Sequence, residues 1–413
     1  MSETTNLTPK KKMKLWKKII LAIVAIMIAF IIVVLAIFFG VWHDEIANVR
    51  SMEHVRERNA EHLDGSVYQM NAQGGFYFDE FIAQGGVSSD SELIGFITDH
   101  ITRGVIDMGI SESEIACASF TAQTEEGDTI WARNYDFKKT NVMIVFTEAT
   151  EGRHASVSTA DLQFLGLDTE SDMNGLMDKI TALASPFVPL DGMNDAGVSC
   201  GIYMSYQGEE TIATNQDTEK PDITSTTLLR LILDYADSVE EAVELAQQYD
   251  LHDSAQTSYH YMVADSTGKS AILEWVAVGG TDVTDNDGSS RQLVVTYNDD
   301  DAHIGEAEGA SDYQWITNFI IQPDYYAEDV TPPGFDRYEK IYEDLSATNG
   351  VVVDEWAAMD ILSNVGRRTW NNDDGNGCTV HSVVYNLTDK TVLWVSNENY
   401  DDETAIFEFK LGE

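Results

Sequence analysis

The chain has 413 residues, of which 43% are hydrophobic and 10% aromatic, so it is long enough to bury one large core or two modest ones. Its formal net charge is −45, and six lysines and one glutamate precede residue 43, so the rest of the chain carries about −50. A body this acidic repels nucleic acid and anionic membrane surfaces, which argues against both as ligands. Adaptation to salt, acid or an exposed surface is the simplest meaning of this acidity.

The first element is an almost unbroken apolar run from Ile19 to Val41, long enough to cross the hydrocarbon core of a bilayer. Lysines precede it and acidic residues follow Trp42, so the positive-inside rule places the N-terminus in the cytoplasm and the rest outside the cell. A cleaved signal peptide is the alternative, but the run is longer than a usual signal core and no small-x-small site closes it. We therefore expect a basic cytoplasmic tail at 1–18 and a single-pass signal anchor at 19–42.

The segment after the apolar run is polar. Because the stretch from His43 to His62 is polar and helix-prone, we expect residues 43–73 to form a stalk that holds the remainder away from the membrane. Residues 74–116 follow as an N-terminal piece. Within it, Ser89-x-x-Glu92 is a capping box that predicts the start of a helix, and Gly104 is its natural end.

The most informative stretch runs from Cys117 to Phe137 and predicts a β-hairpin. Small or polar residues alternate with apolar ones, Glu125–Asp128 supplies the turn, and a β-branched and aromatic strand returns. If Thr124 pairs with Thr129, the carboxylate of residue 136 lies opposite Cys117.

Two charged residues on the returning strand lie near the predicted partner of Cys117. Arg133 and Asp136 are three residues apart, so a regular strand points them to opposite faces. Both can serve Cys117 only if the ladder is bulged or ends near Asn134.

A cysteine that opens such a hairpin, closed by R-N-Y-D-F at 133–137, resembles the N-terminal-nucleophile amide hydrolases. These include choloylglycine hydrolase, penicillin V acylase, acid ceramidase and N-acylethanolamine acid amidase. The resemblance extends from about Gly74 to the C-terminus, and it implies an α+β fold with a four-layer αββα sandwich, here preceded by one transmembrane helix. It also implies that Cys117 becomes the first residue of a catalytic chain at 117–413, with Ile115-Ala116-Cys117 as the scissile region.

Further elements follow in regular order. We expect strands at 142–147 and 156–164, helices at 226–236 and 239–249, a hairpin at 259–264 and 270–275, a strand at 292–297, helices from 334 and at 355–365, and strands at 380–387, 391–397 and 405–410.

The resemblance implies three more site residues. D-G-M-N-D-A-G-V at 191–198 predicts a tight turn by itself, and it resembles a family segment whose Asn helps to form the oxyanion site, which implies that role for Asn194. The family places another oxyanion Asn after a V-T strand, often as T-N. This chain reads Thr296-Tyr297-Asn298, so Asn298 takes the role one residue late or the site is altered. Arg337 matches a family Arg, although pairing with Asp336 or Glu339 at the surface is the alternative.

The cysteines and acidic loops suggest no other site. An odd count of three cysteines is not a disulfide scaffold; Cys200 and Cys378 could pair, but two buried small side chains are the more typical outcome. The loops at 285–288 and 372–375 lack the ligands of an EF-hand, and His43, His54 and His62 lack zinc-like spacing. We expect neither a metal nor a cofactor.

These residues imply one chemistry. A thiol at Cys117 becomes a strong nucleophile when ionised, and Arg133 would stabilise the thiolate. The free amine of an N-terminal Cys can act as the base, oriented by Asp136, while Asn194 and Asn298 would offer donors to the oxyanion.

We therefore expect a membrane-anchored, extracellular hydrolase of linear amides. Its small-molecule substrate would be an N-acyl amide with an apolar acyl part, such as a conjugated bile acid, an N-acylethanolamine or penicillin V. An acyltransferase of the same fold and an inactive surface binding protein are the alternatives. The sequence selects no acyl chain, amine or oligomeric state.

Overall fold

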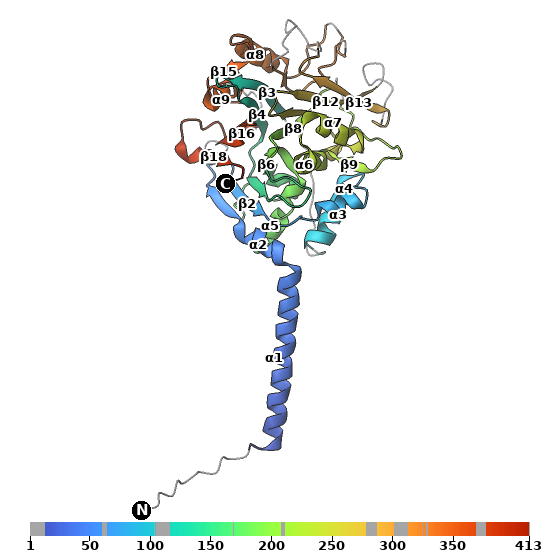
Figure 1. The fold of residues 1–413 in the computed structure, drawn as a ribbon, viewed down its shortest axis with the longest axis vertical. Coiled ribbons are helices and arrows are strands. Elements are labelled where there is room, and N and C mark those ends of the chain that lie inside the picture. Colours follow the sequence, from blue (N-terminus) through green and yellow to red (C-terminus); the bar gives the residue numbers. More distant parts are fainter. Residues whose placement is uncertain are drawn as a thin grey trace, which may run out of the picture.

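The computed structural model describes residues 13–59, 64–102, 104, 116–167, 169–207, 211–277, 287–300, 313–323, 325–327, 329–368 and 377–412. Within them, two large sheets form the body of the molecule (Figure 1). Five strands of the larger sheet, β6, β7, β8, β11 and β12, are buried along their whole length, because helices cover one face and the second sheet covers the other.

The nine-stranded sheet runs in the order β1-β2-β5-β6-β7-β8-β11-β12-β13. Only the pairing of β2 with β5 is parallel among these neighbours. Its strands are β1 (Glu53–Arg56), β2 (Val67–Ala72), β5 (Val142–Thr147), β6 (Ser156–Asp161), β7 (Pro189–Asn194), β8 (Val198–Met204), β11 (Tyr259–Asp265), β12 (Ser270–Ala277) and β13 (Arg291–Tyr297).

The seven-stranded sheet carries the predicted hairpin at its centre, in the order β14-β3-β4-β16-β17-β18, and β15 pairs with β3 in parallel. Its strands are β3 (Ala116–Thr124), β4 (Thr129–Lys138), β14 (Trp315–Ile316), β15 (Val351–Val352), β16 (Gly377–Asn386), β17 (Thr391–Ser396) and β18 (Ile406–Lys410). A separate parallel pair joins β9 (Asp222–Thr224) and β10 (Asp250–His252).

Helices cover the outer face of each sheet. α6 (Ser225–Tyr235) contacts β7 and β8, and α7 (Val239–Gln247) contacts β11 and β12 of the nine-stranded sheet. α8 (Phe335–Ser346) and α9 (Glu355–Asn364) lie on β3, and α9 also contacts β4 and β16. The sheets face each other across a shared core, so the predicted four-layer αββα arrangement is confirmed.

Shorter helices connect these layers. They are α3 (Phe78–Ala83), α4 (Asp90–Ile97), a π-helical turn (Thr98–Thr102), α5 (Leu176–Ala182), and 3₁₀ turns at Leu162–Leu165, Ser185–Phe187, Ser254–Gln256 and Glu403–Ala405. Ser89 caps α4 as predicted, since its hydroxyl accepts from the Glu92 N–H; the Glu92 carboxylate accepts from the N–H of Ser88, one residue before the cap. The strand expected at 156–164 ends at Asp161, where a 3₁₀ turn begins.

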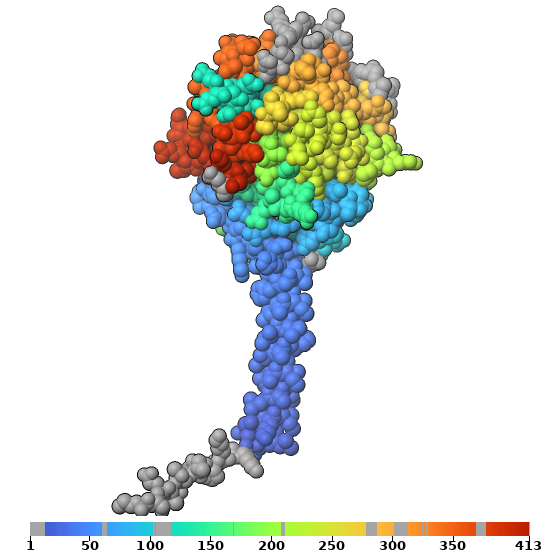
Figure 2. Space-filling view, in the orientation of Figure 1, coloured from blue at the N-terminus to red at the C-terminus, as the bar shows by residue number. Residues whose placement is uncertain are grey.

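The predicted membrane segment is a single helix, α1 (Leu15–Val41), which projects from the body with no residue buried (Figures 1 and 2). It is long and apolar enough to cross a membrane. Only Trp42 separates it from α2 (His43–Ser51).

The described residues between 43 and 73 do not form the predicted stalk, because they fold into the body of the domain. α2 packs on β2, and β2 pairs with β5 inside the nine-stranded sheet. The polar composition suggested a solvated segment, but its buried polar groups are hydrogen-bonded within the structure. The Tyr77 hydroxyl donates to buried Glu45, and the Gln73 N–H donates to buried Asn48.

Candidate active site

The hairpin β3–β4 places Cys117 one residue away from the predicted register. Cys117 lies opposite Tyr135, and Ala116 lies opposite Asp136. The shift arises because the turn takes in Thr124, whose hydroxyl accepts from the Asp128 N–H, while Gly127 adopts a φ of +95° that suits glycine.

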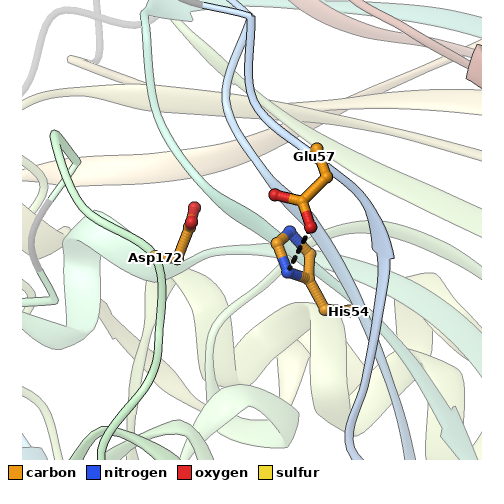
Figure 3. Close-up of side chains that lie close together, drawn as sticks. All are labelled: His54, Glu57 and Asp172. Atoms are coloured by element: carbon orange, nitrogen blue, oxygen red, sulfur yellow. Dashed lines mark ion pairs between the residues drawn. The ribbon is translucent and has the colours of Figure 1, made fainter.

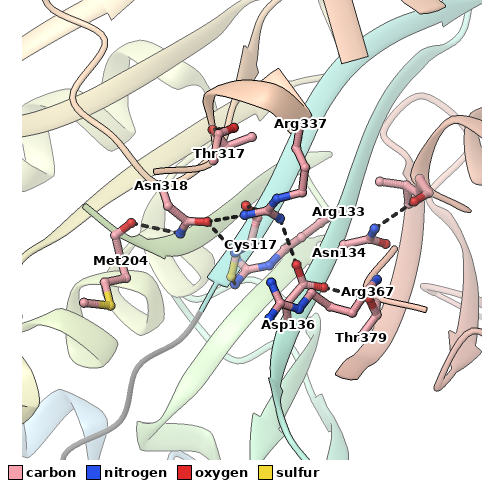
Figure 4. A network of polar contacts seen from close by, with 12 residues as sticks. Cys117, Arg133, Asn134, Asp136, Met204, Thr317, Asn318, Arg337, Arg367 and Thr379 are labelled. Carbon is pink, nitrogen blue, oxygen red and sulfur yellow. Dashed lines mark hydrogen bonds and ion pairs between the residues drawn. The ribbon is translucent and has the colours of Figure 1, made fainter. Parts of the chain in front are cut away.

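Arg133 meets the sulfur of Cys117, with Nη2 at 3.3 Å from Sγ (Figure 4). The guanidinium is fully buried and donates to two carbonyls of the facing sheet, Leu190 O at 2.6 Å and Ile202 O at 2.7 Å. Gly201 makes room for it, since a Cβ there would lie 2.2 Å from Nη1. The nine-stranded sheet therefore fixes the cation beside the thiol.

Asp136 lies on the opposite face of β4, as the spacing predicted, and reaches Cys117 by another route. Its carboxylate accepts from Arg337 Nη1 at 2.9 Å and from the Thr379 hydroxyl at 2.7 Å. The same Nη1 lies 3.4 Å from the backbone oxygen of Cys117. The surface alternative for Arg337 is wrong, because this side chain is buried and pairs with Asp136 (Figure 4).

No bulge interrupts β3–β4; the irregularity lies in the neighbouring strand β16, between Thr379 and His381. In a regular strand these two residues would share a face. The extra residue lets Thr379 bond to Asp136 while His381 bonds to Asp191 of the nine-stranded sheet. One bulge therefore supplies partners to both faces of the site.

Asn318, which the sequence reasoning missed, binds the Cys117 backbone nitrogen. Its Oδ1 accepts from the Cys117 N–H at 3.0 Å and from Arg337 Nη2 at 2.8 Å, and its Nδ2 donates to Met204 O (Figure 4). The signal was present, because Thr317-Asn318 is an intact T-N pair directly after β14. Asn298, which follows the V-T strand, lies twenty residues earlier in the chain.

The structure does not bring Asn194 to Cys117. Its Nδ2 donates to Leu233 O and Ala236 O, and its Oδ1 accepts from Ala196 and Val198, so the side chain holds the turn after β7. It lies four residues, or about 13 Å, along the strand from the residue whose carbonyl binds Arg133. Both amide hydrogens are therefore engaged away from the thiol.

Asn298 likewise has a different position from the one expected. It holds the β12–β13 connection, accepting from the Ser270 N–H and donating to Gly268 O. Gly268 approaches Gln123 at the turn end of the hairpin, six residues or about 20 Å along β3 from Cys117. The expected oxyanion role of Asn298 therefore has no geometric support.

A buried carboxylate lies behind Arg133. Asp191 Oδ2 is 3.4 Å from Arg133 Nε and accepts from His381 Nε2 at 2.8 Å, while its Oδ1 accepts from the Tyr385 hydroxyl. All four side chains are buried, and they link the two sheets behind the thiol. Sequence reasoning predicted only a turn at Asp191, since its partners His381 and Tyr385 lie about 190 residues away in the chain.

The electrostatics of the site favour a protonated thiol in the uncut chain. Burial raises the pKa of Cys117 to about 11, although Arg133 lowers it. Burial also raises the pKa of Asp136, against the opposing effect of Arg337. Asp191 differs, because His381 and Arg133 lower its pKa despite its burial. A base is therefore required before Cys117 can react at neutral pH.

The other two cysteines are free and buried, Cys200 in β8 and Cys378 in β16, so the structure contains no disulfide between them. The outcome that is more typical of such cysteines is confirmed.

Three potential metal ligands lie near one another in the N-terminal half of the chain. His54, Glu57 and Asp172 bring ligand atoms within 4.8 Å of one another (Figure 3). However, Asp172 already pairs with Arg58 at 2.9 Å and accepts from the Ser66 hydroxyl, so we assign no metal to them. The acidic loop at 372–375 and part of that at 285–288 lie outside the described residues.

One family of known proteins matches part of this chain. The model of a family described as linear amide C-N hydrolases, choloylglycine hydrolase family, matches residues 117–294, and no curated protein matches. Among solved structures, a mutant conjugated bile acid hydrolase from Clostridium perfringens is 15% identical, with 71% of this chain and 92% of that chain covered and a TM-score of 0.45. Penicillin V acylase from Agrobacterium tumefaciens is 17% identical, with 68% and 83% covered and a TM-score of 0.42.

A third structure, the Caenorhabditis elegans ortholog of N-acylethanolamine-hydrolyzing acid amidase, is 15% identical, with 66% of this chain and 93% of that chain covered and a TM-score of 0.36. The family match begins at the residue that opens the hairpin. Residues 117–294 are therefore similar to the linear amide C–N hydrolases, choloylglycine hydrolase family.

Proposed function

We propose that this chain is a membrane-anchored hydrolase of N-acyl amides in which Cys117 is the nucleophile. One observation carries the proposal: the sulfur of Cys117 lies 3.3 Å from the Arg133 guanidinium, while Asn318 binds the Cys117 backbone nitrogen at 3.0 Å. The nucleophile, its stabilising cation and a ligand for its amine thus converge on one residue.

Cleavage before Cys117 would supply the missing base. The Cys117 nitrogen is a peptide nitrogen in this structure, and hydrolysis of the Ala116–Cys117 bond would convert it into an amine with a pKa near 8. Such an amine can take the thiol proton and later return it to a leaving group. Asn318 Oδ1, which already accepts from this nitrogen, would hold the amine in place.

The same asparagine can complete the oxyanion site. One hydrogen of Asn318 Nδ2 is bonded to Met204 O; the second has no partner among the described residues and would meet the developing negative charge. A single donor of this kind typically lowers the barrier by roughly 3 kcal/mol. We therefore assign to Asn318 the role first expected of Asn194 and Asn298.

The proposed reaction has two halves. In the first, the Cys117 sulfur bonds to the substrate carbonyl carbon as its proton passes to the α-amine, and the C–N bond then breaks as that proton moves to the leaving amine. In the second, water attacks the thioester, the C–S bond breaks, and the acid and the thiol are released. Arg133 stabilises the sulfur anion in both halves.

The chain that precedes Cys117 would remain bound after cleavage. β2 pairs over six residues with β5, and its Met70 and Ala72 are fully buried. Asp64, which lies before β2 and pairs with Arg56, also pairs with Arg368 of the later chain. We therefore infer a two-chain enzyme that α1 still tethers to the membrane, with its N-terminus in the cytoplasm.

Hydrolysis of a substrate panel tests the function. Membranes that contain the full chain should hydrolyse at least one of a conjugated bile acid, an N-acylethanolamine, an acyl-homoserine lactone and penicillin V. Cys117→Ser should abolish this activity and slow the appearance of two bands on a denaturing gel. A single full-length band in active enzyme would exclude the N-terminal-nucleophile mechanism.

Protease added to intact cells tests the orientation. The domain after Trp42 should be digested and the extreme N-terminus spared; protection of the whole chain would contradict this topology.

A further inference from the structure

A cavity of about 310 Å³ lies at the end of the body from which α1 projects, where α2 meets the chain that leads into α3 (Figure 1). Two aromatic residues, Phe76 and Tyr77, form part of its wall. Four carboxylates also line it, two from α2 and two from α3: Asp44, Glu45, Asp79 and Glu80. This volume is typical of a site for a small organic group, and the carboxylates give the wall a negative charge.

Glu45 is the most enclosed of the four carboxylates, because only 7% of the residue is exposed whereas the other three lie at the surface. Its Oε1 accepts from the Tyr77 hydroxyl, and its Oε2 has no partner in the described part of the chain. A buried carboxylate without a cation is costly. Glu45 is therefore suited to a cation that a ligand brings into the cavity.

The protein itself supplies no such cation. Among the described residues, no lysine or arginine pairs with the four carboxylates; Asp44 bonds to the neighbouring histidine and Asp79 to a tyrosine hydroxyl. Arg153 lies 4.9 Å from the centre of the Phe76 ring, but it donates to two backbone carbonyls and lies 3.8 Å from Asp234. The cavity therefore keeps an uncompensated negative charge.

The anchor sets the height of this cavity above the lipid. The apolar part of α1, Ile19–Val41, is about 34 Å long, close to the ~30 Å thickness of a hydrocarbon core. Trp42 then lies at the outer boundary, where tryptophan is enriched in membrane proteins. Asp44 and Glu45 follow within less than one helical turn, so the cavity opens at the level of the lipid headgroups.

The composition of the wall favours one class of headgroup. The carboxylates repel a headgroup that carries only a phosphate. Among the described residues, no three of these four bring oxygens within 4.8 Å of one another, so the set is too open for a metal ion. An ammonium group suits it, because its several donors can reach separate carboxylates and the Tyr77 ring can contact its charge.

We propose that this cavity binds the ammonium group of a zwitterionic phospholipid, such as a phosphatidylethanolamine, from the outer leaflet. The inference rests on the proposed membrane anchoring. Glu45 pairs with the ammonium inside the cavity, Asp79 and Glu80 meet it from α3, and the lipid phosphate stays in the headgroup layer. The lipid thus gives the body a second attachment to the membrane beside α1.

Two lipids of equal size test this binding. In phosphatidylpropanol a methyl group replaces the ammonium of phosphatidylethanolamine. The full chain is placed in vesicles with equal amounts of both, extracted in mild detergent, and analysed by native mass spectrometry for the lipid that stays bound. We expect about tenfold more of the ethanolamine lipid on the wild type. Glu45→Gln keeps an acceptor for Tyr77 but removes the charge, and it should lower this ratio to about two.

Glu53→Gln is the matched control, because Glu53 is exposed in β1 and does not line the cavity. Phosphatidylpropanol has a net negative charge, so general repulsion by the acidic chain also raises the ratio. The control loses the same charge as Glu45→Gln and should keep the wild-type ratio, while melting temperatures report whether each variant folds. A wild-type ratio of one, or an unchanged ratio in Glu45→Gln, would overturn the proposal.

Two further measurements separate the source of the ligand from the anchoring. Soluble glycerophosphoethanolamine at the concentration of the vesicle lipid should leave the ratio unchanged. If it removes the bound lipid, the cavity takes an amine from solution and the lipid assignment is wrong. If the chain stays in the supernatant when the vesicles are pelleted, the anchoring is wrong and the inference falls with it, whereas a ratio of one in pelleted protein contradicts the inference alone.

Discussion

The two sheets contribute differently to the molecule. The seven-stranded sheet carries Cys117, Arg133 and Asp136, and each of its strands begins at or after Ala116. The nine-stranded sheet carries the groups that hold Arg133 in place, and its first two strands precede Ala116. A cut before Cys117 would leave the first sheet within one fragment and divide the second between two, so the nucleophile and the anchor depend on different sheets.

Two carboxylates of the nine-stranded sheet sharpen this difference. Asp161 and Asp191 are both buried, and both reach across to β4. Asp191 meets Arg133 and His381, which lower its pKa. Asp161 accepts from the hydroxyls of Tyr135 and Thr140, and burial raises its pKa to about 6. The nine-stranded sheet thus places the charged carboxylate of Asp191 beside the Arg133 guanidinium and the less acidic carboxyl group of Asp161 beside the Tyr135 phenol.

The largest expected effect comes from removing one buried thiol from each sheet in turn. Cys117→Ala should lower amidase kcat/KM by about a thousandfold or more, because no other group replaces the nucleophile. Cys200→Ala removes an equally buried thiol from the nine-stranded sheet and should leave the rate within about threefold. Rates on one anilide substrate decide between them, and equal losses would show that the thiol of Cys117 has no special role.

Removing the charge of the Asp191 carboxylate should have the next largest effect. Asp191→Asn leaves Arg133 buried without its carboxylate and should cost about 3–5 kcal/mol of unfolding free energy. Asp195→Asn, a partly exposed site that pairs with His154, should cost less than about 1 kcal/mol. Urea unfolding in the uncut Cys117→Ala background measures the loss of unfolding free energy in each variant. Similar losses would mean that the Asp191 carboxylate stabilises the fold no more than that of Asp195.

Loosening the divided sheet tests the tether. Met70→Ala in β2 should create a cavity that costs about 2–5 kcal/mol and weakens the hold of β2 on β5. After cleavage, dilute urea should then wash more of the 117–413 fragment from membranes than in the wild type. Asn71→Ala, on the exposed face of the same strand, is the control. Release of the fragment from wild-type membranes by buffer alone would indicate that cleavage frees the enzyme.

The smallest effect concerns pH. Asp161 has a pKa of about 6 when folded and near 3.9 when unfolded, so its contribution to stability is full below about pH 4 and is lost as the pH rises through 6. Asp161→Asn should reduce the loss of unfolding free energy between pH 4 and 6 by roughly 1–3 kcal/mol. The part of this pH dependence that comes from Asp253, whose pKa is also raised to about 6, should remain.

Asp191→Asn should change the pH dependence of the unfolding free energy in the opposite direction. Because the pKa of Asp191 is lowered, its contribution is present above about pH 4 and is lost as the pH falls. Urea unfolding from pH 4 to 8 in the uncut background should therefore separate the two variants. Parallel curves would contradict the assigned environments.

Local signals in the sequence predicted local structure well. Ser89 caps the helix that it was expected to begin, since a cap depends only on a few consecutive residues. The hairpin was correct except for one residue of register, because Gly127 admits more than one turn type. The opposite facing of Arg133 and Asp136 followed from strand geometry alone.

Residues that depend on distant partners were not predictable in the same way. Asn318 is separated from Cys117 by about 200 residues, and only the packed sheets bring its amide to the backbone nitrogen. Asn194 matched the expected motif, yet its side chain holds a turn. The segment 43–73 appeared solvated because its buried polar groups, Glu45 and Asn48, have partners that sequence does not reveal.

The short connection between α1 and α2 has a mechanical consequence. Because only one residue separates the two helices and α2 packs on β2, α1 is connected to the body as a rigid rod and not through a flexible linker. If a bilayer holds this rod, turning it about its axis turns the whole catalytic body, and the body keeps a nearly constant height above the lipid. Such an enzyme searches in two dimensions, at one fixed depth and pose, and meets molecules that are concentrated at the membrane surface far more often than those dilute in the medium.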